Sequence, residues 1–157
     1  MKLDSGIQEK DREKLAEGLS KLLADSSVLY LKTQGFHWNV EGPLFHSLHG
    51  LFLSQYTELW ESMDAIAERI RALGCYSPAS FKKFLELTSV SEATGKHLLA
   101  KEMIHHLILD NEALAKSARS VLFLSHSLSD EVTSELVTER MKAHEKNIWM
   151  LRSSNHD

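Results

Sequence analysis

The sequence predicts an all-α fold, a bundle of four long helices with a short extra helix in the crossover between the second and the third of them. The 157 residues include only 7 glycines and 2 prolines, fewer chain breakers than the many turns of a β-sandwich or a doubly wound α/β fold require. Apolar residues also recur every three or four positions in four long segments, which is the period of an amphipathic helix. We therefore expect one domain over residues 1–157, with flexible ends at about 1–8 and 153–157.

The first two long helices are expected on either side of residues 39–43, a loop rich in turn-forming residues. The first helix spans about residues 9–38. The second spans about residues 44–73 and ends at Gly74, where a left-handed C-cap is expected. The apolar stripe that predicts the first helix consists of Leu15, Leu19, Leu22, Leu29 and Phe36.

The crossover contains one helix-start signal, Ser77-Pro78. Serine is a preferred N-cap and proline is tolerated in the first turn. This signal predicts a short helix that ends near Leu87.

The last two long helices follow from the same kind of pattern. The third is expected to begin after Ser91 and to end near Leu124. Ser129 is expected to cap the fourth, which then runs to about Leu151.

Composition and charge exclude several function classes. The single cysteine, Cys75, rules out an internal disulfide framework. No apolar run is long enough to cross a membrane, and residues 1–14 alternate acids and bases, so we expect no secretory signal and a cytoplasmic protein. With a formal net charge of −4, the chain as a whole has no electrostatic reason to bind DNA or anionic lipid.

Two histidines and two acids in the first half of the chain are candidate metal ligands. His37 ends the first helix and His49 begins the second, so their imidazoles are placed to face each other across the loop. Asp64 and Glu68 lie four residues apart, which puts both carboxylates on one helix face. A mixed set of nitrogen and oxygen ligands suits iron, manganese or zinc.

The spacing of these candidates prevents one chain from completing the site. Fifteen residues separate His49 from Asp64, which is about 22 Å along a straight helix. Either the residues share no site, or a second copy packed antiparallel brings the acids to the histidines. Without a shared site, the histidines are ordinary helix-end residues and the acids form a solvated face, with Arg69 and Arg71 as ion-pair partners.

Three stretches of the sequence carry a longer and more specific pattern. They are His37-Trp38-Asn39-Val40-x-Gly42-Pro43-x-Phe45-x-x-Leu48-His49, then Gln55-Tyr56 with Asp64-x-x-Ala67-Glu68-Arg69-Ile70-x-x-Leu73-Gly74, and finally His144-Glu145-Lys146-x-x-Trp149-Met150-Leu151-Arg152. This pattern resembles the Dps family, the DNA-protection-during-starvation mini-ferritins of the ferritin superfamily. The resemblance implies a ferritin-like four-helix bundle. It also implies a homo-oligomer, a hollow dodecameric shell built from two-fold dimers.

The resemblance further implies an iron-oxidising (ferroxidase) site at the two-fold interface. His37 and His49 of one subunit would bind iron together with Asp64 and Glu68 of its neighbour. The family oxidises Fe(II), commonly with hydrogen peroxide and otherwise with dioxygen, and stores the Fe(III) mineral inside the shell. Trp38 lies beside the site in the pattern, either to pack there or to intercept radicals.

One position departs from the family pattern. Members carry an acid one helical turn after the second histidine, where this chain has Leu53. Glu58 is more than one turn farther on and is a poor substitute. The departure predicts, as an alternative, a shell with weakened ferroxidase activity that lacks one carboxylate for a second metal position.

Two further expectations concern iron entry and DNA. Asp130 and Glu135, near the start of the last helix, are candidates for the acidic pore residues of the family, and helix capping is the alternative reading. Residues 1–20 contain four bases against five acids, and DNA phosphates require clustered bases. We therefore expect weak or no DNA binding. A DNA-binding protein of the nucleoid is the alternative function.

Overall fold

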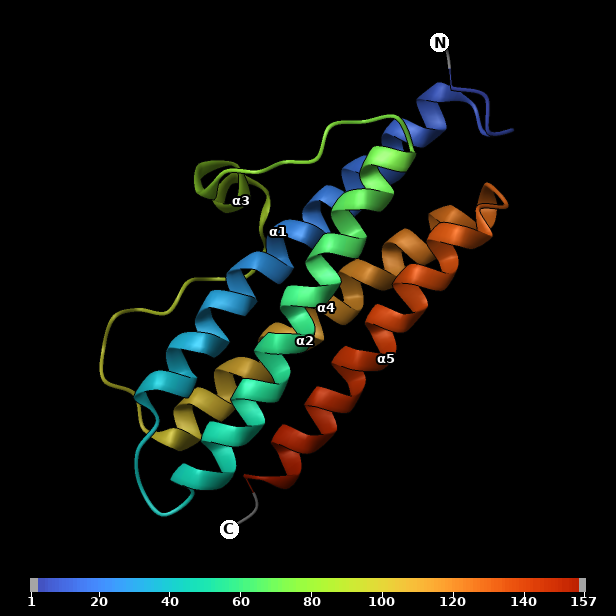
Figure 1. Cartoon of the computed structure of the whole chain (residues 1–157). Helices are drawn as coiled ribbons and strands as arrows, with labels where there is room; N and C mark the ends of the chain where they lie inside the picture. Colours follow the sequence, from blue (N-terminus) through green and yellow to red (C-terminus); the bar gives the residue numbers. More distant parts are fainter. Residues whose placement is uncertain (1–2, 156–157) are drawn as a thin grey trace.

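The computed structural model describes residues 3–155, which form five α-helices and no strand (Figure 1). The predicted all-α bundle with a short helix in its crossover is confirmed. The ends expected to be flexible, 1–8 and 153–157, lie partly outside the described residues. Within residues 3–155, no helix is both long and apolar enough to cross a membrane. The helices are α1 (Glu9–Asn39), α2 (Phe45–Ala72), α3 (Phe81–Leu87), α4 (Ala100–Ser127) and α5 (Glu131–Ser153).

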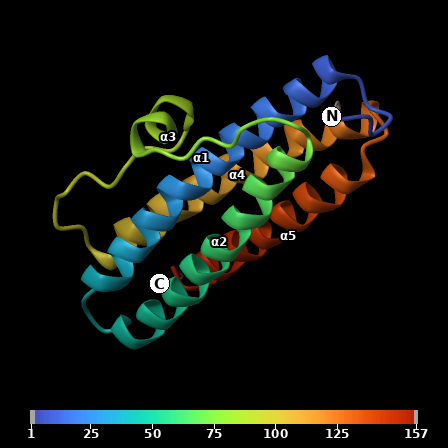
Figure 2. The same cartoon turned by 45° about the horizontal axis from the view of Figure 1, so that its top comes forward.

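The long helices pack as two antiparallel pairs, α1 with α2 and α4 with α5, and α1 also packs against α4. The crossover, residues 73–99, runs along the flank of the bundle and places α3 beside α1 (Figures 1 and 2). It returns the chain to the end at which α2 began. The start of α4 therefore lies at the same end of the bundle as the loop between α1 and α2.

Two apolar clusters fill the bundle from one end to the other. Leu15 and Ile66 lie in the cluster near the start of α1, and Phe36 and Phe52 lie in the cluster near its end. Every residue of the predicted α1 stripe is at most 5% exposed. Because burying one such side chain stabilises a protein by about 1.5–3 kcal/mol, these clusters are the main source of the bundle's stability.

A fully buried carboxylate, Asp25 of α1, connects the crossover to the bundle through hydrogen bonds. It accepts hydrogen bonds from the backbone N–H of Ser89 (2.6 Å) and from the hydroxyls of Thr88 (2.9 Å) and Ser117 (3.0 Å). The ammonium group of Lys21 lies 2.9 Å from the same carboxylate. Asp25 therefore joins α1, the crossover and α4 at one point.

Three helices, α3, α4 and α5, begin later than the sequence predicted. Ser80, and not Ser77, caps α3 through its side-chain oxygen, so Pro78 lies before the helix. Asp130, and not Ser129, caps α5. Ser129 has a φ of +54°, a conformation in which it ends the turn after α4 and cannot serve as an extended cap residue.

The start of α4 is the largest difference from the prediction, because the helix begins at Ala100 and not after Ser91. Gly95 has a φ of +71°, which is incompatible with a right-handed helix. The Glu102 carboxylate accepts a hydrogen bond from the Leu99 N–H at 2.7 Å. This contact satisfies a free donor at the helix end and fixes the start there.

A polar layer crosses the core where α4 faces α5. His144, fully buried, donates its Nδ1–H to the Asn111 side-chain oxygen at 2.9 Å, and its Nε2 has no partner among the described residues. Burial, and to a smaller extent the charge of Arg140, lowers the pKa of His144 from 6.5 to about 3. His144 is therefore neutral in the folded chain.

Acid should destabilise the bundle through His144. At pH values above 6.5 the side chain is neutral in both states, and below it the unfolded chain binds a proton that the folded chain does not. The free energy of unfolding should fall by up to about 1.4 kcal/mol per pH unit between pH 6.5 and about 3. Denaturant unfolding at several pH values measures this slope. The His144→Gln variant should show a flatter profile, and parallel profiles would contradict the assignment.

Candidate metal centre

The two candidate imidazoles meet where α1 passes into α2. His37 lies in the last turn of α1 and is 8% exposed, and His49 lies in the second turn of α2 and is half-buried. Gly42 turns the connecting loop with a φ of +103°, which a residue with a Cβ rarely adopts. The two rings stack with their centroids 3.7 Å apart and their planes 18° apart. The imidazoles therefore face each other, as their positions in the sequence predict.

Reciprocal hydrogen bonds place a hydrogen on the Nδ1 atom of each ring. The Nδ1 atom of His37 lies 2.7 Å from the His49 carbonyl oxygen, and the Nδ1 atom of His49 lies 2.8 Å from the His37 carbonyl oxygen. A carbonyl only accepts, so each Nδ1 carries the hydrogen. In the neutral ring each Nε2 then has a free lone pair, which is the form that binds a metal.

Aromatic rings surround this histidine pair. Phe45 stacks on His49 at 5.0 Å, and Tyr56 of α2 meets the His37 ring edge-on at 5.3 Å. The sequence alone assigns no role to Tyr56, although its position seven residues after His49 is two helical turns away on the same face. Trp38 is 62% exposed and so is not packed inside its own chain.

The two candidate carboxylates lie elsewhere on α2. Asp64 and Glu68 are exposed, and the arginines proposed as their ion-pair partners form hydrogen bonds with other groups. Arg69 binds Asp130, and Arg71 donates to the carbonyl of Cys75. The ion-pair reading of the two acids is therefore wrong.

The described residues of one chain bring no three potential ligands of the His, Cys, Asp or Glu type together around a metal ion. Because α2 is continuous from Phe45 to Ala72, His49 and Asp64 stay about 22 Å apart along its axis. The histidine pair of one chain is at most half of a metal site, a half-site. Any ion held by both pairs needs the acids of another subunit.

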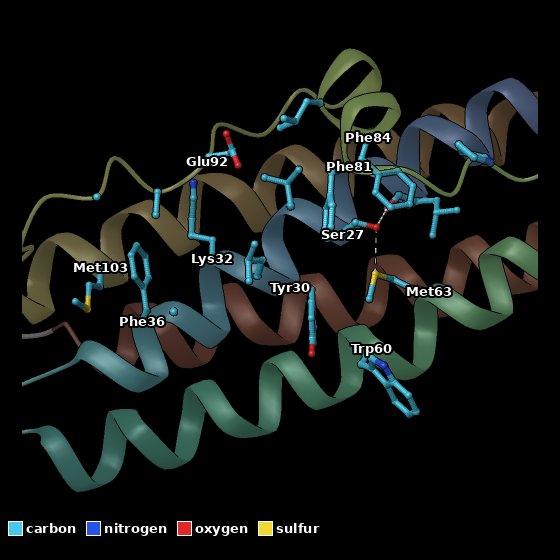
Figure 3. A pocket seen from close by; sticks show the side chains of 18 of the residues that line it. Ser27, Tyr30, Lys32, Phe36, Trp60, Met63, Phe81, Phe84, Glu92 and Met103 are labelled. Carbon is cyan, nitrogen blue, oxygen red and sulfur yellow. Dashed lines mark hydrogen bonds between the residues drawn. The ribbon is translucent and has the colours of Figure 1, made fainter.

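A groove of about 1680 Å³ runs along α1 and α2 beneath the crossover, and Asp64 lies in its wall. Tyr30 of α1 and Trp60 of α2 line it, and Phe81 and Phe84 of α3 face it from the other side (Figure 3). Trp60 is 63% and Phe81 is 83% exposed. A contiguous apolar surface of this kind is typical of an interaction site.

The comparisons with known proteins agree with this architecture. Residues 16–155 match the family model of the ferritin-like domain. The DNA protection during starvation protein 2 of Bacillus anthracis is 37% identical over 141 residues, which are 90% of this chain and 96% of that protein. The crystal structure of the Dps protein of Vibrio cholerae, described as a member of a broad superfamily of ferritin-like diiron-carboxylate proteins, superimposes with a TM-score of 0.93 at 31% identity, over 99% of this chain and 98% of that one.

The chain belongs to the Dps family. A second Dps structure, from Bacillus brevis, has a TM-score of 0.90 at 31% identity and covers 99% of this chain and 100% of its own. The Dps fold accounts for the four long helices and for the short one in the crossover.

Among the described residues of this Dps chain, no acid takes the place of Leu53 beside the histidine pair. Leu53 is 44% exposed, one turn after His49 on α2. Glu58 binds Arg140 instead, because both of its carboxylate oxygens accept hydrogen bonds from the Arg140 guanidinium. Within the described residues, the half-site therefore offers two nitrogen ligands and no carboxylate.

The two pore candidates of this Dps chain differ in their surroundings. Asp130 is 3% exposed, and its carboxylate accepts hydrogen bonds from Arg69 and Thr133. Burial by itself would raise the pKa of Asp130, but the bonds from Thr133 and the charge of Arg69 hold it below its ordinary value. This arrangement fits the capping alternative for Asp130. Glu135 is exposed on the next turn of α5 and remains the pore candidate.

Proposed function

We propose that this Dps protein oxidises Fe(II) and stores it as a ferric mineral inside a hollow dodecameric shell. The observation that carries the proposal is the histidine pair, in which main-chain carbonyls hold both imidazoles with their Nε2 lone pairs free. Paired imidazoles with fixed tautomers are suited to hold a divalent metal ion. Fe(II) is the substrate of this site, and hydrogen peroxide, before dioxygen, is its oxidant.

A two-fold partner supplies the rest of the site in this proposal. The midpoint between His49 and Asp64 on α2 falls at residues 56–57. A second α2 that crosses antiparallel at this midpoint brings its Asp64 beside His49, and the symmetry repeats the contact on the other side. The same docking covers the apolar groove, of which Leu31 and Trp60 are exposed parts.

The chemistry follows from the ligand types. Two neutral imidazoles and two carboxylates form a set that suits Fe(II) and, through its negative charge, stabilises Fe(III) more. Electron loss from the bound ion is therefore favoured. When two ions are bound, peroxide takes one electron from each and leaves as water without releasing hydroxyl radical.

Assembly and iron oxidation test the proposal together. The purified chain should sediment as a dodecamer. Stopped-flow absorbance should show that peroxide oxidises Fe(II) faster with the protein than without it. The same measurement with dioxygen gives the oxidant preference. A monomer that oxidises Fe(II) at the full rate would contradict the shared site.

Replacing Leu53 with aspartate should speed the reaction. An acid one turn after His49 gives the half-site a carboxylate, and we expect Leu53→Asp to raise the rate of Fe(II) oxidation about tenfold by securing a second ion. Leu53→Asn, which has the same size without the charge, is the matched control. Equal rates in wild type, Leu53→Asp and Leu53→Asn would show that position 53 does not limit the reaction.

DNA binding is weak or absent in this proposal, although the Bacillus anthracis relative is named for DNA protection. The chain carries 22 acids against 18 bases, and counterion release requires clustered bases. A gel-shift titration at physiological salt should show no stoichiometric complex, and a tight one would favour the nucleoid alternative.

A further inference from the structure

The aromatic contacts of the histidine pair continue to a second tyrosine. The His37 ring meets Tyr56 at 5.3 Å, and Tyr56 meets Tyr30 of α1 edge-on at 5.9 Å. Both tyrosines are half-buried. The third tyrosine of the chain, Tyr76, is 89% exposed in the crossover, where it contacts the Arg71 guanidinium. Two of the three tyrosines therefore lie in a chain of rings that begins at the histidine pair.

The contact between Tyr56 and His37 matters because of the number of electrons that the proposed reaction requires. Reduction of hydrogen peroxide to water consumes two electrons, and one Fe(II) supplies one. The half-site has no carboxylate at Leu53, so two imidazoles and the partner's two acids give four protein ligands, a set for one ion and not for two. A single Fe(II) reduces peroxide to hydroxide and a hydroxyl radical unless another donor is in contact.

We propose that Tyr56 is the second electron donor of this reaction, an inference that rests on the proposed function. The O–O bond of peroxide breaks as Fe(II) and the Tyr56 phenol each give up one electron. The phenolic proton and one proton from solvent complete two water molecules. Fe(III) and a tyrosyl radical remain, so atoms, charge and electrons balance.

The position of Tyr56 fits this role better than that of the other tyrosines. Its ring is in edge contact with His37, a proposed iron ligand, so the electron has a short path through that imidazole. Tyr30 is one ring farther from His37 and lines the groove (Figure 3). Tyr76 belongs to the crossover and is separate from this chain of rings.

Freeze-quench electron paramagnetic resonance tests the proposal on the full-length protein. The protein is loaded with Fe(II) without oxygen, mixed with less than one equivalent of hydrogen peroxide and frozen. Wild type should show a tyrosyl radical signal, and about one Fe(II) should be oxidised per peroxide in the first turnover. Tyr56→Phe should lose the signal and release more hydroxyl radical to a spin trap. Phenylalanine keeps the ring, and thermal unfolding by circular dichroism checks that the fold is retained.

Tyr30→Phe and Tyr76→Phe are the matched controls, and both should keep the radical signal. A full signal in Tyr56→Phe, or an equal loss in either control, would overturn the assignment. Oxidation of two Fe(II) per peroxide without any radical would overturn it as well while leaving the proposed function in place. Failure of wild type to oxidise Fe(II) with peroxide would refute the proposed function itself.

Discussion

Assemblies formed from equal amounts of His37→Ala and Asp64→Ala chains should oxidise Fe(II), although each variant alone should be nearly inactive. In a mixed dimer, one site combines both defects and the other combines an intact histidine pair with intact acids. Random pairing makes half of the dimers mixed, so about one quarter of all sites, and of the wild-type rate, should return. Co-expression of two differently tagged chains and stopped-flow measurement of Fe(II) oxidation give the recovered fraction.

This mixing experiment separates a shared site from a site within one chain. If all ligands came from one chain, mixing two dead variants would restore nothing. His37→Ala is a suitable variant because the His37 carbonyl, which accepts the hydrogen bond from His49, belongs to the main chain and survives the substitution. A co-assembly of His37→Ala with His49→Ala is the matched control, because every site then lacks an imidazole. Recovery in that control would contradict the assignment of the ligands.

Loss of the buried Asp25 carboxylate should be the most damaging single change to stability. Asp25→Ala leaves the Ser89 N–H and the hydroxyls of Thr88 and Ser117 without their acceptor. We expect the free energy of unfolding to fall by about 3 kcal/mol, because buried donors without partners each cost a substantial part of their desolvation energy. Denaturant unfolding at a fixed protein concentration measures the loss.

Asp25→Asn provides the matched control, because it keeps the shape and one acceptor oxygen but loses the charge that faces Lys21. Its loss should be clearly smaller than that of Asp25→Ala. Hydrogen exchange at the Ser89 amide should speed up in both variants while the helices stay protected. An Asp25→Ala protein as stable as wild type would show that the crossover is held by its apolar contacts alone.

The long helices were predictable because their signal is local. Leu15, Leu22 and Phe36 recur at the helical period, and each is buried. The start of α4 was not predictable in the same way. Ser91 offers a cap, but the backbone at Gly95 adopts a left-handed conformation and Glu102 fixes the start nine residues later.

The candidate site also has a part that the local sequence predicts and a part that it does not. The facing of His37 and His49 follows from a short loop between two helices and was predictable. The anchoring of the crossover was not, because Asp25 binds groups 63 to 92 residues away in the sequence. The contact of Tyr56 with His37 depends on how α1 packs on α2, and no local pattern specifies it.

The reciprocal bonds between the histidine rings and main-chain oxygens have one more consequence. Many metal sites orient an imidazole with a neighbouring carboxylate, which adds negative charge and ties the site to one more side chain. Here the peptide path from His37 to His49 performs that task. The geometry of the two imidazoles is thus insensitive to mutation of nearby side chains. It is vulnerable to any insertion or deletion in residues 40–44, which would misalign both imidazoles at once.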